Sequence, residues 1–131
     1  MAYLWVALGG ALGCIARYWI SGLVAERYAH AFPWNTLVVN VTGSLAIGFL
    51  AAITSTEVAA DPRPGFRQFA MVGICGGYTT FSSFSLQTLD LLRDREWLYA
   101  SGNVILSVVL CLIAVWLGYI IGAVLFSSKG Q

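Results

Sequence analysis

The sequence GGYTTFSSFS, residues 76–85, lies inside a long apolar segment and determines how this part of the chain folds. It contains two glycines and five serine or threonine residues. Glycine and β-branched threonine both weaken a helix, and a broken helix at bilayer depth is tolerated only inside protein or beside a water-filled cavity. These residues therefore predict a helix that is broken in mid-membrane, with backbone carbonyls free to coordinate a cation.

The composition excludes a soluble fold. The chain has 131 residues, of which 59% are hydrophobic and 10% charged, and its mean hydropathy is +0.79. There is too little polar surface to cover a soluble domain, so lipid must be the solvent for much of the chain. A net charge of +1 gives no basic patch for nucleic acid. The three cysteines lie in apolar runs and predict neither a disulfide nor a metal site.

Four segments are long and apolar enough to cross a bilayer, which takes roughly 20 residues of helix. The predicted transmembrane helices are residues 3–24, 36–53, 69–92 and 98–126. Trp34 and Trp97 are placed as interfacial anchors. Because these runs are too long for barrel strands, we predict an all-α membrane protein forming a single membrane domain over residues 1–131.

The basic residues of the connectors show no bias between the two membrane faces. Four spans place both termini and the second connector on one face, so each face has three basic residues. They are Arg63, Arg67 and Lys129 on one face and Arg27, Arg93 and Arg95 on the other. The positive-inside rule then has no asymmetry to act on, which predicts insertion in both orientations, or dual topology.

Pairs of small residues four positions apart occur in every span. They are Gly9 with Gly13, Ser44 with Gly48, Gly73 with Gly77, and Gly118 with Gly122. Such pairs let helix backbones approach closely, within one subunit or between subunits. Because four helices make a thin bundle, we expect the chain to oligomerise.

Two stripes follow the predicted break. Phe81 and Phe84 share one helical face, and Ser82 and Ser85 share another. The positive edge of a phenyl ring favours a small anion without holding it tightly, and the serines donate hydrogen bonds. The alternative is that the phenylalanines pack only against lipid or neighbouring helices.

Polar side chains in the other spans are further candidates. Asn40 is a buried amide in the second span, where it either lines a pore or forms an interhelical hydrogen bond. Asn103, Ser107 and Cys111 recur every four residues and form a polar stripe on the fourth span. Arg17 is a full charge inside the first span, where it either stays within the span as a functional residue or snorkels outward, and in both cases it would attract anions to a vestibule.

The segment at residues 76–85 strongly resembles the signature of the Fluc (CrcB) fluoride channels, and the similarity covers almost the whole chain. It includes Gly9, Gly10 and Arg17 in the first span, and the sequence TLVVN at residues 36–40. Its most specific part is the Gly-Gly-x-Thr-Thr-Phe-Ser-x-Phe-Ser core.

The resemblance implies an antiparallel, dual-topology homodimer with two fluoride pores and a structural sodium ion at the centre. The backbone carbonyls of Gly76 and Thr79 would coordinate sodium, one pair from each subunit. Arg17 would lie near a vestibule. The implied fluoride pore residues are Asn40, Phe81, Phe84, Ser82, Ser83, Ser85 and Ser107.

The sequence departs from the family pattern at a few positions. Cys111 and Val115 stand where the polar track of the fourth helix usually has serine or threonine, which weakens its hydrogen bonding. Tyr78 is a bulky residue in the variable position of the motif. A lineage in which two different subunits pair is also compatible with this chain.

The function implied is passive, selective export of fluoride from a bacterial cytoplasm through the inner (plasma) membrane. The chain contains no phosphate-binding loop and no set of nucleophile, base and orienting residue, so it is not expected to be an enzyme. A small proton-coupled multidrug exporter is an alternative, but it needs a carboxylate within the membrane, and the nearest, Asp90, stands at the end of a span. A purely structural membrane subunit would leave the hydroxyl cluster without a purpose.

Overall fold

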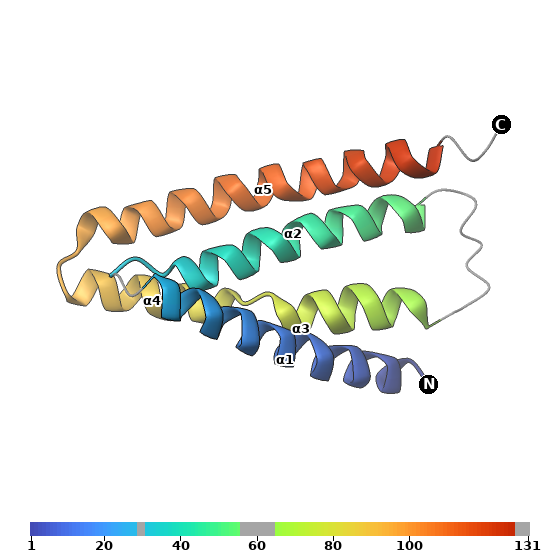
Figure 1. The fold of residues 1–131 in the computed structure, drawn as a ribbon, viewed down its shortest axis with the longest axis horizontal. Coiled ribbons are helices and arrows are strands. Elements are labelled where there is room, and N and C mark those ends of the chain that lie inside the picture. The colour runs from blue at the N-terminus through green and yellow to red at the C-terminus, as the bar shows by residue number, and fades with distance from the viewer. Residues whose placement is uncertain (29–30, 56–64, 128–131) are drawn as a thin grey trace.

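The structure is a computed structural model that describes residues 1–28, 31–55 and 65–127. Three helices are continuous: α1 (Ala2–Arg27), α2 (Trp34–Ser55) and α5 (Trp97–Ser127). The third crossing is divided into the π-helix η2 (Gln68–Cys75), the short α3 (Gly76–Tyr78) and α4 (Phe81–Arg93). Four crossings bring the start of α1 and the end of α5 to the same end of the bundle (Figure 1).

The predicted segments lie within these helices, and the predicted break of the third is confirmed. The helices extend one to three residues beyond each predicted end, because hydrogen bonding continues past the hydrocarbon edge that hydropathy detects. Within the described residues, α1, α2 and α5 are each long and apolar enough to span a membrane. The third crossing runs from Gln68 to Arg93 in segments.

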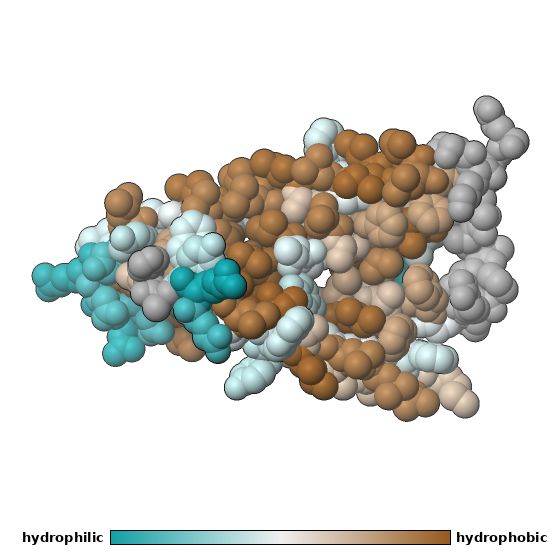
Figure 2. Space-filling view, in the orientation of Figure 1, coloured by the Kyte–Doolittle hydropathy of each residue, from teal (hydrophilic) through white to brown (hydrophobic). Residues whose placement is uncertain are grey.

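The outside of the bundle is apolar along most of its length. Figure 2 shows hydrophobic residues over the body and a hydrophilic cluster at the end formed by the turn between α4 and α5. This end carries the exposed side chains of Arg93, Asp94, Arg95 and Glu96. Exposed large side chains such as Ile15, Leu98 and Leu112 cover the body. The chain is therefore a multi-pass membrane protein, with lipid or another apolar surface against its sides.

Glycine allows α1 to lie directly against the third crossing. A Cβ atom added to Gly73 would lie 2.8 Å from the Cα of Gly9, and one added to Gly77 would lie 2.6 Å from the carbonyl oxygen of Gly10. Real Cβ atoms do not approach backbone this closely. These small residues thus pack helices within one subunit.

The second pair of closely packed helices is α2 and α5, which lie side by side in Figure 1. A Cβ atom on Gly48 would lie 2.9 Å from the carbonyl carbon of Val115, and one on Gly122 would lie 2.7 Å from the Cβ of Ala52. Gly118 is likewise buried against the backbone of α2. The glycines expected to permit close approach therefore do so inside the subunit.

The charged residues bear on the predicted orientation only in part. Arg27, Arg93 and Arg95 lie at the end where α1 finishes, and Arg67 lies at the opposite end, just before η2. Arg63 and Lys129 lie outside the described residues. Dual topology remains a prediction from the sequence.

Candidate functional site: a broken helix beside a cavity

The third crossing breaks at two threonines. Thr79 and Thr80 have extended backbones, with φ/ψ of −79°/157° and −150°/116°. Gly76 is helical at −66°/−37°, and no glycine among the described residues has a positive φ. The glycines were expected to weaken the helix, but both stay helical: Gly77 allows close packing against α1, and the threonines carry the break.

Side chains replace the helical hydrogen bonds that the break removes. The Thr80 N–H donates to Asn40 Oδ1 over 2.8 Å, and Asn40 Nδ2 donates to the Thr80 carbonyl over 3.0 Å. The Thr80 hydroxyl accepts from the Ser83 N–H over 3.2 Å and so caps α4. In an unbroken helix, the amides of residues 80 and 83 would donate to the carbonyls of Gly76 and Thr79. Those two carbonyls have therefore lost their helical donors.

The same two residues border a cavity of about 480 Å³ on the surface of the bundle. Gly76 is exposed, and a Cβ atom placed there would meet only the Met71 carbonyl, at 3.9 Å. Thr79 is half-buried. Carbonyl oxygens without donors beside open space are suitable ligands for a hard cation.

The cavity brings together residues that the sequence singled out in three different crossings. Those lining it are Asn40, Gly76, Thr79, Phe81, Phe84, Ser107 and Cys111. The rings of Phe81 and Phe84 lie 5.3 Å apart between centroids and are tilted by 47°. Phe81 is 78% exposed, whereas Phe84 is buried at 9%. One ring therefore projects from the subunit, and the other forms its wall.

The remaining predicted hydroxyl groups lie outside this lining. The Ser83 hydroxyl accepts a hydrogen bond from the Thr80 hydroxyl over 3.1 Å, and the Ser82 hydroxyl lies 3.3 Å from that same Thr80 oxygen. Ser85 donates to the Phe81 carbonyl over 2.9 Å and is exposed. Within one subunit these three serines therefore serve the local structure of α4.

Arg17 also lies outside the lining, and its side chain is directed toward the third crossing. Arg17 Nη2 lies 3.8 Å from Cys14 Sγ, which in turn lies 3.5 Å from the Gly77 carbonyl. Arg17 is ten residues before the end of α1, or about 15 Å along its axis. The guanidinium therefore lies beside the middle of α1 and close to the third crossing.

Two members of the predicted polar stripe on α5, Asn103 and Ser107, belong to a hydrogen-bond chain that reaches α4. Asn103, fully buried at 0% exposure, donates to the Thr88 hydroxyl over 2.9 Å. Thr88 donates to the Phe84 carbonyl over 2.8 Å, and Ser107 donates to Asn103 Oδ1 over 3.4 Å. Thr88 is not among the residues predicted from the sequence, although its position four residues after Phe84 was a usable signal.

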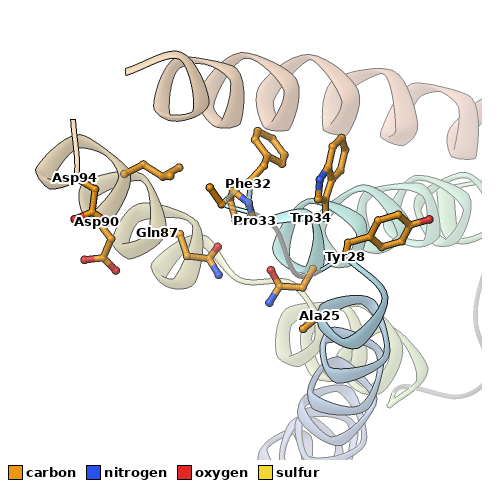
Figure 3. A pocket seen from close by; sticks show the side chains of 11 residues that line it. Ala25, Tyr28, Phe32, Pro33, Trp34, Gln87, Asp90 and Asp94 are labelled. Carbon is orange, nitrogen blue, oxygen red and sulfur yellow. The ribbon is translucent and has the colours of Figure 1, made fainter. Parts of the chain in front are cut away.

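A second cavity, of about 340 Å³, lies at the polar end of the bundle (Figure 3). Its lining includes Trp34 from α2 and the acidic residues Asp90 and Asp94 near the end of α4. Gln87 also faces it, with an Oε1 atom that is buried and has no hydrogen-bond partner in the part of the chain that the structure describes. Because α2 and α4 line both cavities, they connect the polar end with the broken helix.

These features define a class of protein: a multi-pass α-helical membrane protein with a discontinuous helix at bilayer depth, an arrangement typical of proteins that move ions. The sequence matches the family described as CrcB-like protein, Camphor Resistance (CrcB), over residues 4–119. The chain belongs to this family.

Relatives in three bacteria cover nearly the whole chain. Each is named "Fluoride-specific ion channel FluC". The protein of Opitutus terrae is 58% identical and that of Rhodospirillum rubrum 56% identical, each match covering 98% of both chains. The protein of Methylocella silvestris is 50% identical over 99% of both chains.

Proposed function

We propose that this chain is a subunit of a fluoride-selective channel that lets fluoride leave the bacterial cytoplasm passively, down its gradient. The observation that carries the proposal is the cavity beside the broken helix, where an amide, a hydroxyl and two phenyl rings surround one space. Relatives that match almost end to end carry the name of fluoride channels. A channel of this kind catalyses no reaction.

Fluoride must lose water to enter a narrow path, so the protein has to replace the lost hydrogen bonds. Asn40 keeps one N–H beyond the one given to Thr80. The Ser107 hydroxyl lies on the same cavity and would have to release Asn103 Oδ1 in order to donate to fluoride. The edges of Phe81 and Phe84 add a weak positive potential without a full charge. Binding of this strength favours entry and still permits release.

The other predicted pore residues would act in the assembled channel. Ser82 and Ser85 are exposed on α4, and Ser83 is half-exposed, so a neighbouring subunit can bring them beside a fluoride path. Arg17 would raise the local concentration of anions near its vestibule.

The proposed assembly is an antiparallel homodimer around a structural sodium ion. The carbonyls of Gly76 and Thr79 are oxygen ligands of the type that sodium takes, and both residues border the cavity. A second copy would supply an equivalent pair and would cover the exposed Phe81. Carbonyls that are costly to leave unpaired in a membrane would be satisfied by coordinating the ion.

A proton-coupled multidrug exporter is the alternative from another class. Such an exchanger needs a carboxylate inside the membrane, and the described helices carry their only acidic residues near helix ends, at Glu26 and Asp90. A pair of different subunits would have the same pore chemistry and is distinguished by reconstituting this chain alone.

Fluoride efflux from liposomes containing the purified protein tests the proposal, with a fluoride electrode as the detector. Fast loss of fluoride in the presence of sodium, with chloride retained, is the expected result. Absence of fluoride efflux from a verified dimer would refute the function for this chain by itself.

Phe81→Ile tests the role of the aromatic wall. It removes the ring edge but keeps an apolar side chain, so we expect a folded dimer whose fluoride flux falls by at least tenfold. The matched control is Phe126→Ile near the end of α5, which should leave the flux unchanged. Equal fluxes in both variants would exclude Phe81 from the path.

A further inference from the structure

Tyr78 is the last helical residue before the break, and its side chain is bonded to α2. Its hydroxyl lies 2.8 Å from Thr42 Oγ1. The Thr42 hydroxyl donates to the Val38 carbonyl over 2.8 Å, so its own proton is already used. The Tyr78 hydroxyl is therefore the donor to Thr42, and this bond fixes the third crossing to α2 directly before the break.

The ring of Tyr78 lies against the backbone of α2 at Gly43, which is buried. A Cβ atom at Gly43 would lie 3.0 Å from Tyr78 Cδ1 and would collide with the Cγ2 methyl group of Thr79. Asn40, one turn earlier on α2, holds Thr80 on the other side of the break. The backbone of Thr79 is thus held between two contacts with the same helix.

The second of these contacts sets the direction of one carbonyl. The C=O of Thr79 and the N–H of Thr80 belong to one planar trans peptide, so they point in opposite directions. Because the Thr80 N–H points at Asn40, the Thr79 carbonyl points away from Asn40. Tyr78 holds the residue directly before Thr79, so the bond to Thr42 and the bond to Asn40 anchor Thr79 to α2 from both sides.

We propose that Tyr78 is a positioning residue: through its hydrogen bond to Thr42 it holds the Thr79 carbonyl in the direction from which it coordinates a cation. The identity of that cation as sodium rests on the proposed function. This hydrogen bond between Tyr78 and Thr42, which we call the clamp, lies within one subunit. The carbonyl is therefore oriented before any partner or ion binds. Orientation in advance lowers the free energy that cation binding must spend on ordering.

Two variants remove the bond from opposite sides: Tyr78→Phe and Thr42→Val. The first readout is hydrogen–deuterium exchange at the Thr79 and Thr80 amides of the purified protein. The second is the sodium concentration that gives half-maximal fluoride flux in liposomes. We expect the exchange rate of these amides and the half-maximal sodium concentration each to rise about threefold. This factor corresponds to the ~0.6 kcal/mol typical of polar pairs in membrane bundles. The double variant should add little to either single change.

Two controls separate positioning from general damage. Tyr18→Phe removes a hydroxyl from a tyrosine of α1 that is 85% exposed, and it should change neither readout. Thr42→Ser keeps the acceptor oxygen and should retain wild-type values even if Thr42→Val folds poorly.

The two readouts also separate this proposal from the proposed function. Unchanged exchange and an unchanged sodium requirement in Tyr78→Phe would overturn the positioning role. If the wild-type protein carries no fluoride, the channel function fails, and exchange alone decides the clamp. Faster exchange in Tyr78→Phe then supports the clamp, and equal exchange overturns it.

Discussion

Asn40→Asp replaces the amide NH₂ group by an oxygen at the wall of the cavity beside the broken helix. It separates the role of Asn40 in the fluoride path from its role in bonding Thr80. The amide accepts from the Thr80 N–H over 2.8 Å and donates to the Thr80 carbonyl over 3.0 Å. A carboxylate keeps the first bond but loses the second, and it brings two oxygens face to face. The loss costs about 1–3 kcal/mol for a neutral group left unsatisfied and more for a charged one, so we expect a variant that is less stable but still folds.

The effect on fluoride should be much larger than the effect on stability. A carboxylate and a fluoride ion about 4 Å apart repel by ~4 kcal/mol at an effective dielectric constant near 20. At about 1.4 kcal/mol for each factor of ten, this repulsion lowers the occupancy of the path roughly 1,000-fold. Asn40→Asp should therefore form a dimer that carries almost no fluoride.

Fluoride efflux from liposomes measures the flux of the variant, after size-exclusion chromatography has confirmed that the variant is a dimer. Asn35→Asp is the matched control, because it makes the same change at the start of α2, on the cavity at the polar end. We expect its flux to stay within several-fold of wild type, since water screens a charge there. A flux from Asn40→Asp within tenfold of wild type would refute the inference that Asn40 borders the path.

Three further changes test packing, the α4–α5 network and the charge at the polar end. Gly77→Ala would force α1 away from the third crossing and should lower the thermal midpoint in detergent by the equivalent of ~1–3 kcal/mol, whereas Gly22→Ala, which meets no atom within 4 Å, should not. Asn103→Leu should destabilise the bundle by ~1 kcal/mol, and adding Thr88→Val should cost little more if the two residues form one network. Asp90→Asn should raise fluoride flux roughly twofold at low ionic strength and have no effect at high salt; an equal increase at both would point away from electrostatics.

The sequence was sufficient to predict the helices, because their period, length and apolar character reflect the bilayer directly. It also predicted a break within residues 76–85. It did not predict the residues at which the backbone becomes extended, since Thr79 and Thr80 leave the helix through contacts with α2 that are distant in sequence. Nor did it predict the π-helix that precedes the break, which composition does not reveal.

The candidate site shows the same division between local and long-range information. The motif allowed Phe81 and Phe84 to be assigned to one face, because helical spacing determines this. Asn40 was left between a pore role and a packing role, and the structure shows the packing bond to Thr80. The Tyr78–Thr42 bond was missed because a variable motif position and an ordinary helical threonine carry no signal alone.

The distribution of satisfied and unsatisfied groups around the break indicates how the channel is assembled. Asn40 and the Thr80 hydroxyl bond two of the freed amides inside one subunit, whereas Gly76 and Thr79, whose carbonyls have lost their helical donors, border an open cavity. In lipid, an unpaired carbonyl is costly, so a surface of this kind is stable only against protein, water or an ion. Two of the freed donors are thus satisfied locally, and the carbonyls of Gly76 and Thr79 are left for a ligand that the subunit does not itself contain. This asymmetry favours a cation at the break and makes anion selectivity depend on the amide and ring edges next to it.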